Sequence, residues 1–250
     1  QELKSEVLGR FRGQDLEIRQ KGLFVELYGL IYPQYNEDIH FIDDFDIPSH
    51  WPKATATDPH LAKPITTVWM ARAPEDYKGF LKGDYFVYRE LSKEGIPSDV
   101  VMALKVATGN ERLKGRLGDP SLNIRSENFP GLNTFDEYAQ LGWPMLPANK
   151  SVMAGIDKIR DYLGSRPPKL YVFKSCPGTN YEFKHYKLKD ISDDFSKNYS
   201  DRILKRNDDF LDPIRYIVNS PLLEIRRRLD VTNAYEYTES GRIKRIRAYG

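Results

Sequence analysis

Three closely spaced stretches with the character of β-strands limit the possible folds of this 250-residue chain most. They are residues 54–58 (ATATD), 66–73 (TTVWMARA) and 85–91 (YFVYREL). β-Branched or aromatic residues recur in all three, as is typical of strands, and turn residues such as Gly83 stand between them. Short connections join neighbouring antiparallel strands, so the sequence predicts a meander of three strands.

The pattern changes after the meander, because helical and strand-like segments alternate from there. The first expected helix begins at Ser98, a residue type favoured as N-cap, and stops at Gly109, with Val101, Leu104 and Ala107 on its inner face. Further segments follow: a strand at 116–118, a helix at 134–141, a strand at 143–147, a helix at 151–163 and a strand at 170–173. The sequence therefore predicts an α/β fold, in which a mixed central sheet with an antiparallel meander and parallel strands is flanked by helices.

Composition predicts a soluble globular protein, since 40% of the residues are hydrophobic and 30% are charged. The first ten residues lack the apolar core of a signal peptide, and no apolar run approaches the roughly 18 residues of a membrane span. The single cysteine, Cys176, excludes an intrachain disulfide and suits a reducing compartment. The four histidines show no paired spacing, which argues against zinc. The formal net charge of +2 points to no particular partner.

Acidic residues mark the places where chemistry could occur. Asp58 ends the first strand of the meander, and Asp119 ends the strand after the first helix. If these strands are neighbours, their backbones lie about 4.8 Å apart and the two carboxylates can share one ligand. Asp208, Asp209 and Asp212 crowd into one short stretch, and the helix after Asp209 or Asp212 can bring a third carboxylate to the pair. Like charges about 4 Å apart repel by roughly 4 kcal/mol at an effective dielectric near 20, which water or a cation must offset.

Each of these aspartates also has a purely structural explanation. Asp58 and Asp119 both precede a proline and can simply begin turns. Asp212 precedes Pro213, and this pair fits the N-cap and first residue of a helix. Asp208 fits a solvated side chain or a helix cap.

Several longer stretches follow one another in an order that resembles a known family. They are WPKATATDPHLAKPITTVWMA, GDYFVYREL, GDPS, VMAGIDKIRDYL, PPKLYVFKSCPGTNYEFKHYKLK and NDDFLDPIRY, preceded by LIYPQYNEDIHFIDDFDIPSHW. Over residues 30–216 this order resembles the nuclease domain of the large terminase subunit of tailed bacteriophages, with the segment that leads into it. The resemblance implies a ribonuclease H-like fold and metal-dependent cleavage of double-stranded DNA, which cuts concatemeric viral genomes during packaging into a procapsid.

The resemblance assigns metal ligands residue by residue. It places the first aspartate at Asp58 (ATATDPH), the second at Asp119 (GDPS) and the third at Asp209 or Asp212 (NDDFLDPIRY). Pro213 stands where the family usually has alanine, which favours a late helix start, at Asp212, and leaves the main third ligand open. Two Mg²⁺ or Mn²⁺ ions about 3.5 to 4 Å apart, bridged by Asp58 on its rigid central strand, are expected with DNA bound, because these metals prefer oxygen ligands.

The domain organisation follows from a missing motif. No GxxxxGK[ST] sequence occurs, so the chain carries no P-loop ATPase motor, which the family's full-length subunit has ahead of its nuclease. We therefore expect three parts: residues 1–50 as a linker or extension from the missing ATPase motor, 51–220 as the ribonuclease H-like nuclease domain, and 221–250 as a basic C-terminal tail.

Double-stranded DNA is the expected partner, with the portal and the small terminase subunit reached through the full-length protein, in the host cell cytoplasm and without a membrane. Duplex phosphates need cations beside the acidic residues. The candidates are Lys63, Lys114, Arg116, Lys150, Lys174, Lys184, Lys187, Lys205 and Arg206.

Two alternative functions stay open. A noncatalytic module could dock DNA or the portal through the basic run 226–228 and the tail, and a nuclease of the same fold could act in recombination or transposition.

Overall fold

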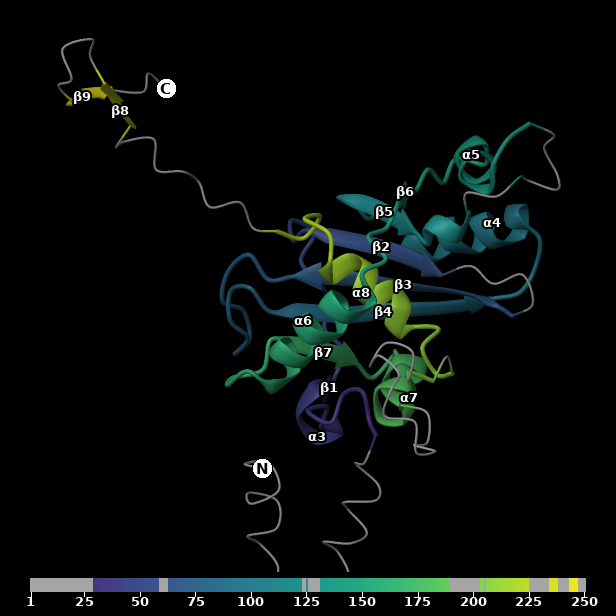
Figure 1. The fold of residues 1–250 in the computed structure, drawn as a ribbon, viewed down its shortest axis with the longest axis horizontal. Helices are drawn as coiled ribbons and strands as arrows, with labels where there is room; N and C mark the ends of the chain where they lie inside the picture. The colour runs from purple at the N-terminus through teal and green to yellow at the C-terminus, as the bar shows by residue number, and fades with distance from the viewer. Residues whose placement is uncertain are drawn as a thin grey trace, which may run out of the picture.

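A seven-stranded mixed sheet forms the centre of the protein in the computed structural model (Figure 1). The structure describes residues 29–58, 63–122, 125, 131–188, 203–204, 206–224, 234–237 and 243–246. The strands of the sheet lie in the order β1-β7-β4-β3-β2-β5-β6. Their bounds are β1 (Phe41–Ile42), β2 (Lys53–Asp58), β3 (Ile65–Arg72), β4 (Tyr85–Lys93), β5 (Gly115–Gly118), β6 (Leu146–Pro147) and β7 (Leu170–Phe173).

The three strands predicted first form the meander in the middle of this sheet. β2 pairs with β3, and β3 pairs with β4, both in antiparallel register. β5 runs parallel to β2, β6 runs parallel to β5, and β7 runs parallel to both β4 and β1. The predicted α/β fold with a mixed central sheet is therefore confirmed. β2 is buried along its whole length, as expected of a central strand that is covered on both faces.

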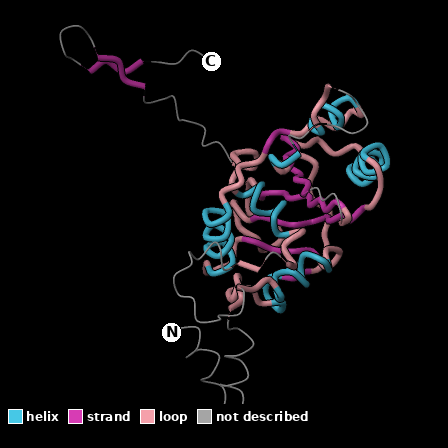
Figure 2. Tube along the Cα trace, turned by 45° about the vertical axis from the view of Figure 1, so that its right-hand side comes forward, coloured by secondary structure: helices cyan, strands magenta, loops and turns pink. Residues whose placement is uncertain are grey.

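Helices are arranged around the strands, as Figure 2 shows. They are α3 (Glu37–His40), α4 (Pro97–Thr108), α5 (Thr134–Gln140), α6 (Val152–Gly164), α7 (Pro177–His185) and α8 (Leu211–Val218), with a short 3-10 helix η1 (Pro120–Leu122). α8 packs on β2, β3 and β5, and α6 packs against α8 (Figure 1). α4 is tied to β3 by a hydrogen bond of 3.0 Å from Trp69 Nε1 to Thr108 Oγ1.

The two faces of β2 meet different parts of the chain. Asp58 contacts Tyr216 of α8, and side chains alternate along a strand, so Ala54 and Ala56 face α8 as well. These small side chains leave room for α8 to lie close to the sheet. Lys53 and the threonines of β2 point to the opposite face.

The segment before β2 holds one end of the sheet with its aromatic side chains. The ring centroid of Phe45 lies 4.8 Å from that of Phe173 and 5.3 Å from that of Phe86. Trp51 is fully buried beside them, with its ring centroid 5.6 Å from Phe86. This aromatic cluster fixes the entry of the chain into β2.

Two local predictions are wrong. α4 begins before Ser98, because Pro97 occupies its first turn and Ile96 serves as N-cap without a side-chain hydrogen bond. Within 143–147 only β6 pairs with the sheet, since the backbone N–H of Trp143 donates to the Tyr138 carbonyl at the end of α5. α7 lies in a stretch for which no element was predicted.

Some expectations fall outside the described residues, namely residues 1–28 of the N-terminal extension and the basic run 226–228. In the tail, β8 (Ala234–Tyr237) pairs with β9 (Ile243–Ile246) in an antiparallel hairpin. None of the helices in the described part of the chain has the length and apolar character needed to cross a membrane. The division into three parts stays a prediction.

Candidate active site

Two buried aspartates meet at one edge of the sheet, where β2 and β5 end. Asp58 is the last residue of β2, and Asp119 directly follows β5. The strands are parallel neighbours with Thr57 opposite Gly118, and the backbone N–H of Asp119 donates to the Thr57 carbonyl at 3.3 Å. Asp58 is only 6% exposed and Asp119 only 4%. Both side chains named from the sequence therefore lie together with little access to water.

The hydroxyl group of Tyr216 on α8 joins these two carboxylates. It lies 2.6 Å from Asp119 Oδ2 and 3.3 Å from Asp58 Oδ1. One hydroxyl donates one proton, so the shorter contact to Asp119 is the better hydrogen bond. Tyr216 was not among the site residues predicted from the sequence. Its signal was present, because Tyr216 follows Asp212 by four residues and such residues share one helix face.

The two carboxylates differ in their readiness to lose a proton. Burial and the charge of Asp119 raise the pKa of Asp58 to about 7, although the hydrogen bond from Tyr216 lowers it in part. Burial also raises the pKa of Asp119, but hydrogen bonds from Lys150 (2.8 Å), Tyr216 and Ser121 outweigh it and leave this pKa below its usual value. Asp119 is therefore the permanent anion of the pair, and Asp58 is the member that takes up a proton near neutral pH.

The third group of carboxylates lies at the start of α8. Asp212 forms an ion pair with Arg215, which is itself buried and donates to the Tyr186 hydroxyl at 3.1 Å. Burial raises the pKa of Asp212 to about 7, against the attraction of Arg215, and the charges of Asp208, Asp58 and Asp119 add to the increase. Asp209 is more exposed and accepts a hydrogen bond of 3.1 Å from Lys63. Asp208 has a raised pKa, chiefly through burial.

α8 starts late, as Pro213 predicted, one residue before Asp212 and three residues after Asp208. The helix begins at Leu211, with Phe210 as its N-cap, and the backbone N–H of Asp212 donates to the Asp208 carbonyl at 2.8 Å. Pro213 fits inside the first turn, because the first N–H groups of a helix lack partners in the helix and proline removes none that is needed. Asp212 and Tyr216 thereby stand one turn apart on the same helix.

Glu182 of α7 holds the beginning of α8 in place. Its Oε2 accepts hydrogen bonds from the backbone N–H groups of Phe210 (2.8 Å) and Leu211 (3.1 Å). These groups open the helix and have no carbonyl partner within it. Burial raises the pKa of Glu182 to about 8 in spite of the two bonds. Glu182 was missed in the sequence, where nothing in its neighbourhood distinguishes it from a surface glutamate.

The start of α7 is held in the same manner by Glu90 of β4. Glu90 Oε1 accepts from the backbone N–H of Gly178 at 2.7 Å, and Oε2 accepts from both the N–H and the hydroxyl of Thr179 at 2.8 Å. Gly178 is required there, since an added Cβ would stand 2.5 Å from the Phe210 ring. The partly buried Glu90 thus connects the central sheet to α7, and the buried Glu182 connects α7 to the helix that carries Asp212 and Tyr216.

The donor chemistry of this edge fits a divalent cation such as Mg²⁺ or Mn²⁺. Every side chain proposed from the sequence is a carboxylate, and oxygen donors without histidine or cysteine are what these metals prefer. As the side chains stand, no three acidic, histidine or cysteine residues of the described ranges are grouped closely enough to hold an ion together. The structure unites Asp58 with Asp119, whereas Asp212 is turned to Arg215 and Asp209 to Lys63.

Two of the cations considered as DNA contacts lie at this edge. Lys150 contacts Asp119 at 2.8 Å and Lys63 contacts Asp209 at 3.1 Å, and both lysine side chains are half-exposed. Elsewhere, Lys174 pairs with Asp43.

Comparison with known proteins gives matches among solved structures. No protein-family model matches the chain, and a search of curated proteins found no match either. The large terminase from the thermophilic bacteriophage D6E, in complex with ADP, aligns over 89% of this chain and 52% of its own, with a TM-score of 0.62 and 19% identity. The P22 large terminase nuclease domain aligns over 77% of this chain and 92% of its own, with a TM-score of 0.58 and 22% identity. The large terminase nuclease from thermophilic phage G20c aligns with a TM-score of 0.50 and 9% identity.

The mixed sheet with its flanking helices therefore has the fold of the nuclease domains of large terminases, which confirms the resemblance at the level of the fold. The chain spans about half the length of the D6E protein, with 52% of that protein aligned.

Proposed function

We propose that this chain is a nuclease domain that cuts double-stranded DNA with the help of Mg²⁺ or Mn²⁺, during the packaging of concatemeric viral genomes. The observation that supports the proposal most is the meeting of Asp58 and Asp119 at the ends of two parallel strands, beneath one tyrosine hydroxyl. A stable protein rarely keeps two buried carboxylates together unless a site requires them. The likeness of the fold to terminase nuclease domains agrees with this reading.

In the proposed site, Asp58 and Asp119 hold the metal ions, with Asp209 or Asp212 as the third ligand. Bound divalent ions would activate a water molecule and offset charge on the phosphate. Asp119 is suited to this role because hydrogen bonds keep it ionised. Tyr216 orients both carboxylates, since its hydroxyl lies within 3.3 Å of each. Lys150 and Lys63, half-exposed beside the acidic residues, attract the DNA backbone.

The role in packaging and the partners of the whole protein belong to the same proposal. A domain of this kind would work behind an ATPase motor, reach the portal and the small terminase subunit through the full-length protein, and act in the host cytoplasm. The division at about residues 50 and 220 follows from this proposal.

The experiment is a plasmid assay with matched variants. With Mg²⁺ or Mn²⁺ the protein is expected to nick or linearise supercoiled DNA, and EDTA abolishes the activity. Asp58→Asn and Asp119→Asn each lower the rate by at least about 100-fold, because each removes a metal ligand. Asp161→Asn, at an exposed position of α6, is the control and leaves the rate unchanged. If both site variants cut as fast as the parent while all four proteins remain folded, the proposed site is wrong.

The same assay decides between the two candidates for the third ligand. Asp209→Asn removes a partly exposed carboxylate, whereas Asp212→Asn also removes the counterion of the buried Arg215. The variants are therefore compared in metal titrations and not by rate alone. The main ligand is the residue whose loss raises the metal concentration needed for half-maximal cleavage.

A further inference from the structure

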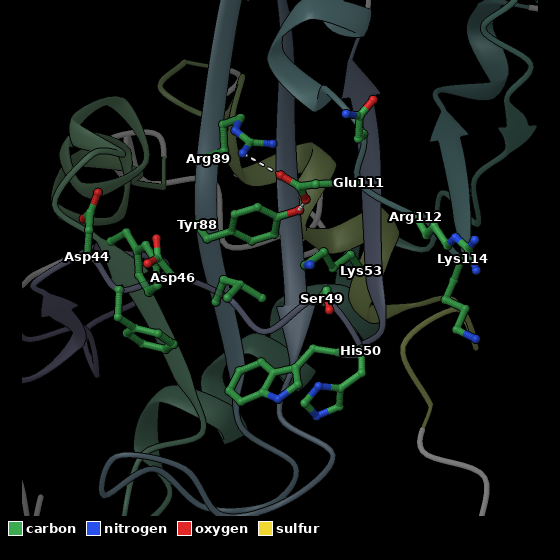
Figure 3. Close-up of a pocket in the computed structure, with 15 residues that line it drawn as sticks. Asp44, Asp46, Ser49, His50, Lys53, Tyr88, Arg89, Glu111, Arg112 and Lys114 are labelled. Atoms are coloured by element: carbon green, nitrogen blue, oxygen red, sulfur yellow. Dashed lines mark hydrogen bonds and ion pairs between the residues drawn. The ribbon is translucent and has the colours of Figure 1, made fainter.

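A cleft of about 940 Å³ lies at the other end of β2, away from the acidic residues (Figure 3). Lys53 begins β2, and Asp58 ends it. Because the two positions differ by an odd number of residues, their side chains point to opposite faces of the sheet. The cleft walls come from the segment before β2, from β4 and from the loop between α4 and β5. The cleft is therefore separate from the proposed nuclease site.

Lys53 in this cleft has an almost unpaired buried charge. The residue is 4% exposed, and its ammonium group makes one hydrogen bond, of 3.2 Å, to the carbonyl oxygen of Pro48. An ammonium group carries three N–H donors, so two of them lack a partner in the described structure. Burial lowers the pKa of Lys53, as expected where a charge is poorly compensated.

The charge of Glu111 raises the pKa of Lys53 but offsets only part of the effect of burial. Glu111 accepts one hydrogen bond from the hydroxyl of Tyr88 and another from Arg89 Nη2, each at 2.6 Å (Figure 3). The charge of Glu111 is thereby matched by Arg89, and no ion pair between Glu111 and Lys53 is formed in the described part of the chain. The Nη1 atom of Arg89 is buried without a hydrogen-bond partner. The floor of the cleft therefore has an excess of positive charge and of N–H donors.

The charges on the rim are separated. Arg112 and Lys114 lie on the same side of Lys53, whereas Asp44 and Asp46 lie on the other side, beyond Tyr88 (Figure 3). A ligand that spans the cleft would meet cations at one end, an aromatic side chain in the middle and carboxylates at the other end.

We propose that this cleft binds a phosphate-bearing ligand of nucleotide size, with its phosphate beside Lys53 and its base towards Asp44 and Asp46. A phosphate offers several charged acceptors to the unpaired donors of the floor. Tyr88 lines the cleft between its two ends, and the two carboxylates can accept hydrogen bonds from amino groups of a base. The volume lies within the usual range of small-molecule sites, roughly 300 to 1,000 Å³. The phosphate can come from a free nucleotide or from an unpaired nucleotide of a DNA strand.

The test is isothermal titration calorimetry of the intact chain in EDTA, so that the acidic edge binds no metal. The probes are pyrophosphate, a nucleoside diphosphate and a short single-stranded oligonucleotide. We expect one pyrophosphate per chain and tighter binding of the nucleoside diphosphate. An oligonucleotide that binds more tightly still, and loses this affinity in Lys53→Met, would identify a DNA strand as the source of the phosphate. Asp58→Asn leaves the affinities for pyrophosphate and the nucleoside diphosphate unchanged, so failure of the nuclease proposal and failure of this one can be told apart.

Variants locate the binding. Lys53→Met removes the charge and keeps the length of the side chain, and it lowers the affinity for pyrophosphate by at least about tenfold. The matched control is Lys158→Met, because Lys158 also donates to a single carbonyl at 3.2 Å but lies on α6, outside the cleft. Lys114→Glu on the rim lowers the affinity severalfold and serves if Lys53→Met fails to fold.

Three results would overturn the proposal. The first is no binding of either phosphate compound up to about 1 mM, a concentration that detects affinities of about −4 kcal/mol. The second is unchanged binding in both Lys53→Met and Lys114→Glu. The third is binding of citrate as tight as that of pyrophosphate, which would show a site for carboxylates.

Discussion

The two ends of β2 both carry buried charge, but the surroundings of that charge differ. At one end Asp58 lies against Asp119, and Tyr216 and Lys150 are hydrogen-bonded to this pair. At the other end Lys53 has a single carbonyl acceptor. The acidic end is assembled from parts of the chain that are far apart, and buried hydrogen bonds keep these parts in place. The comparison shows that like charges are kept together where the surrounding groups donate hydrogen bonds to them, whereas the isolated charge of Lys53 keeps unused donors.

The largest change in stability is expected from replacing Glu182, which holds the start of α8 at the acidic end of β2. Glu182→Ala leaves the backbone N–H groups of Phe210 and Leu211 without an acceptor, and we expect a loss of about 2 to 5 kcal/mol in the free energy of unfolding. Urea denaturation at pH 7 measures it. Glu182→Gln keeps an oxygen acceptor and should cost less than about 1 kcal/mol. Equal midpoints for the two variants would mean that the carboxylate does not support α8.

A smaller effect is expected from Asp58, and it depends on pH. Its pKa of about 7 in the folded protein lies above the ordinary value of about 3.9. Between these two pH values the folded protein therefore binds a proton that the unfolded chain has released. This protonation stabilises the fold fully below about pH 4, and the stabilisation is lost as the pH rises through 7. Asp58→Asn does not titrate in this range.

The stability advantage of Asp58→Asn over the parent should therefore grow between pH 5 and pH 8, by roughly 1 to 3 kcal/mol. Thermal or urea unfolding in EDTA at the two pH values measures the difference. Adding Mg²⁺ at pH 8 should raise the melting temperature of the parent more than that of the variant, because the variant lacks one charge. A difference that stays constant with pH would show that Asp58 is ionised as easily as an exposed aspartate.

The smallest effect is expected at the other end of β2. Lys53→Met removes a poorly paired charge and keeps most of the buried methylene groups, so the ligand-free protein should gain at most about 1 kcal/mol. Lys158→Met in α6 provides the reference. Urea denaturation measures whether Lys53→Met is more or less stable than the parent. A clear loss of stability in Lys53→Met would mean that the ammonium group is satisfied where it is, and the contrast between the two ends would disappear.

The strands and most helices could be predicted because their signals are local. The β-branched and aromatic residues in 66–73 and 85–91 identify β3 and β4 without knowledge of their partners. The meeting of Asp58 and Asp119 could also be anticipated, since both stand at the ends of strands that a mixed sheet can place side by side. These inferences needed only strand ends and the order of the elements.

Features that depend on distant contacts could not be predicted. α7 lacks a clear amphipathic pattern, and its start is held by Glu90 of strand β4. The hydroxyl of Tyr216 reaches Asp119 only because α8 lies across β2 and β5. Local propensity thus gives the elements, whereas the contacts between them decide the orientation of the site.

The burial of α8 has a consequence for the motions of the acidic edge. Apart from Asp212, every residue of this helix is buried, and it packs against the sheet, α6 and α7. Its backbone amides can then exchange with deuterium only when the core of the protein opens. A segment that exchanges last is a poor hinge, so in the proposed nuclease role the adjustment to a DNA duplex would fall to side chains such as Lys63 and Lys150 on the rim.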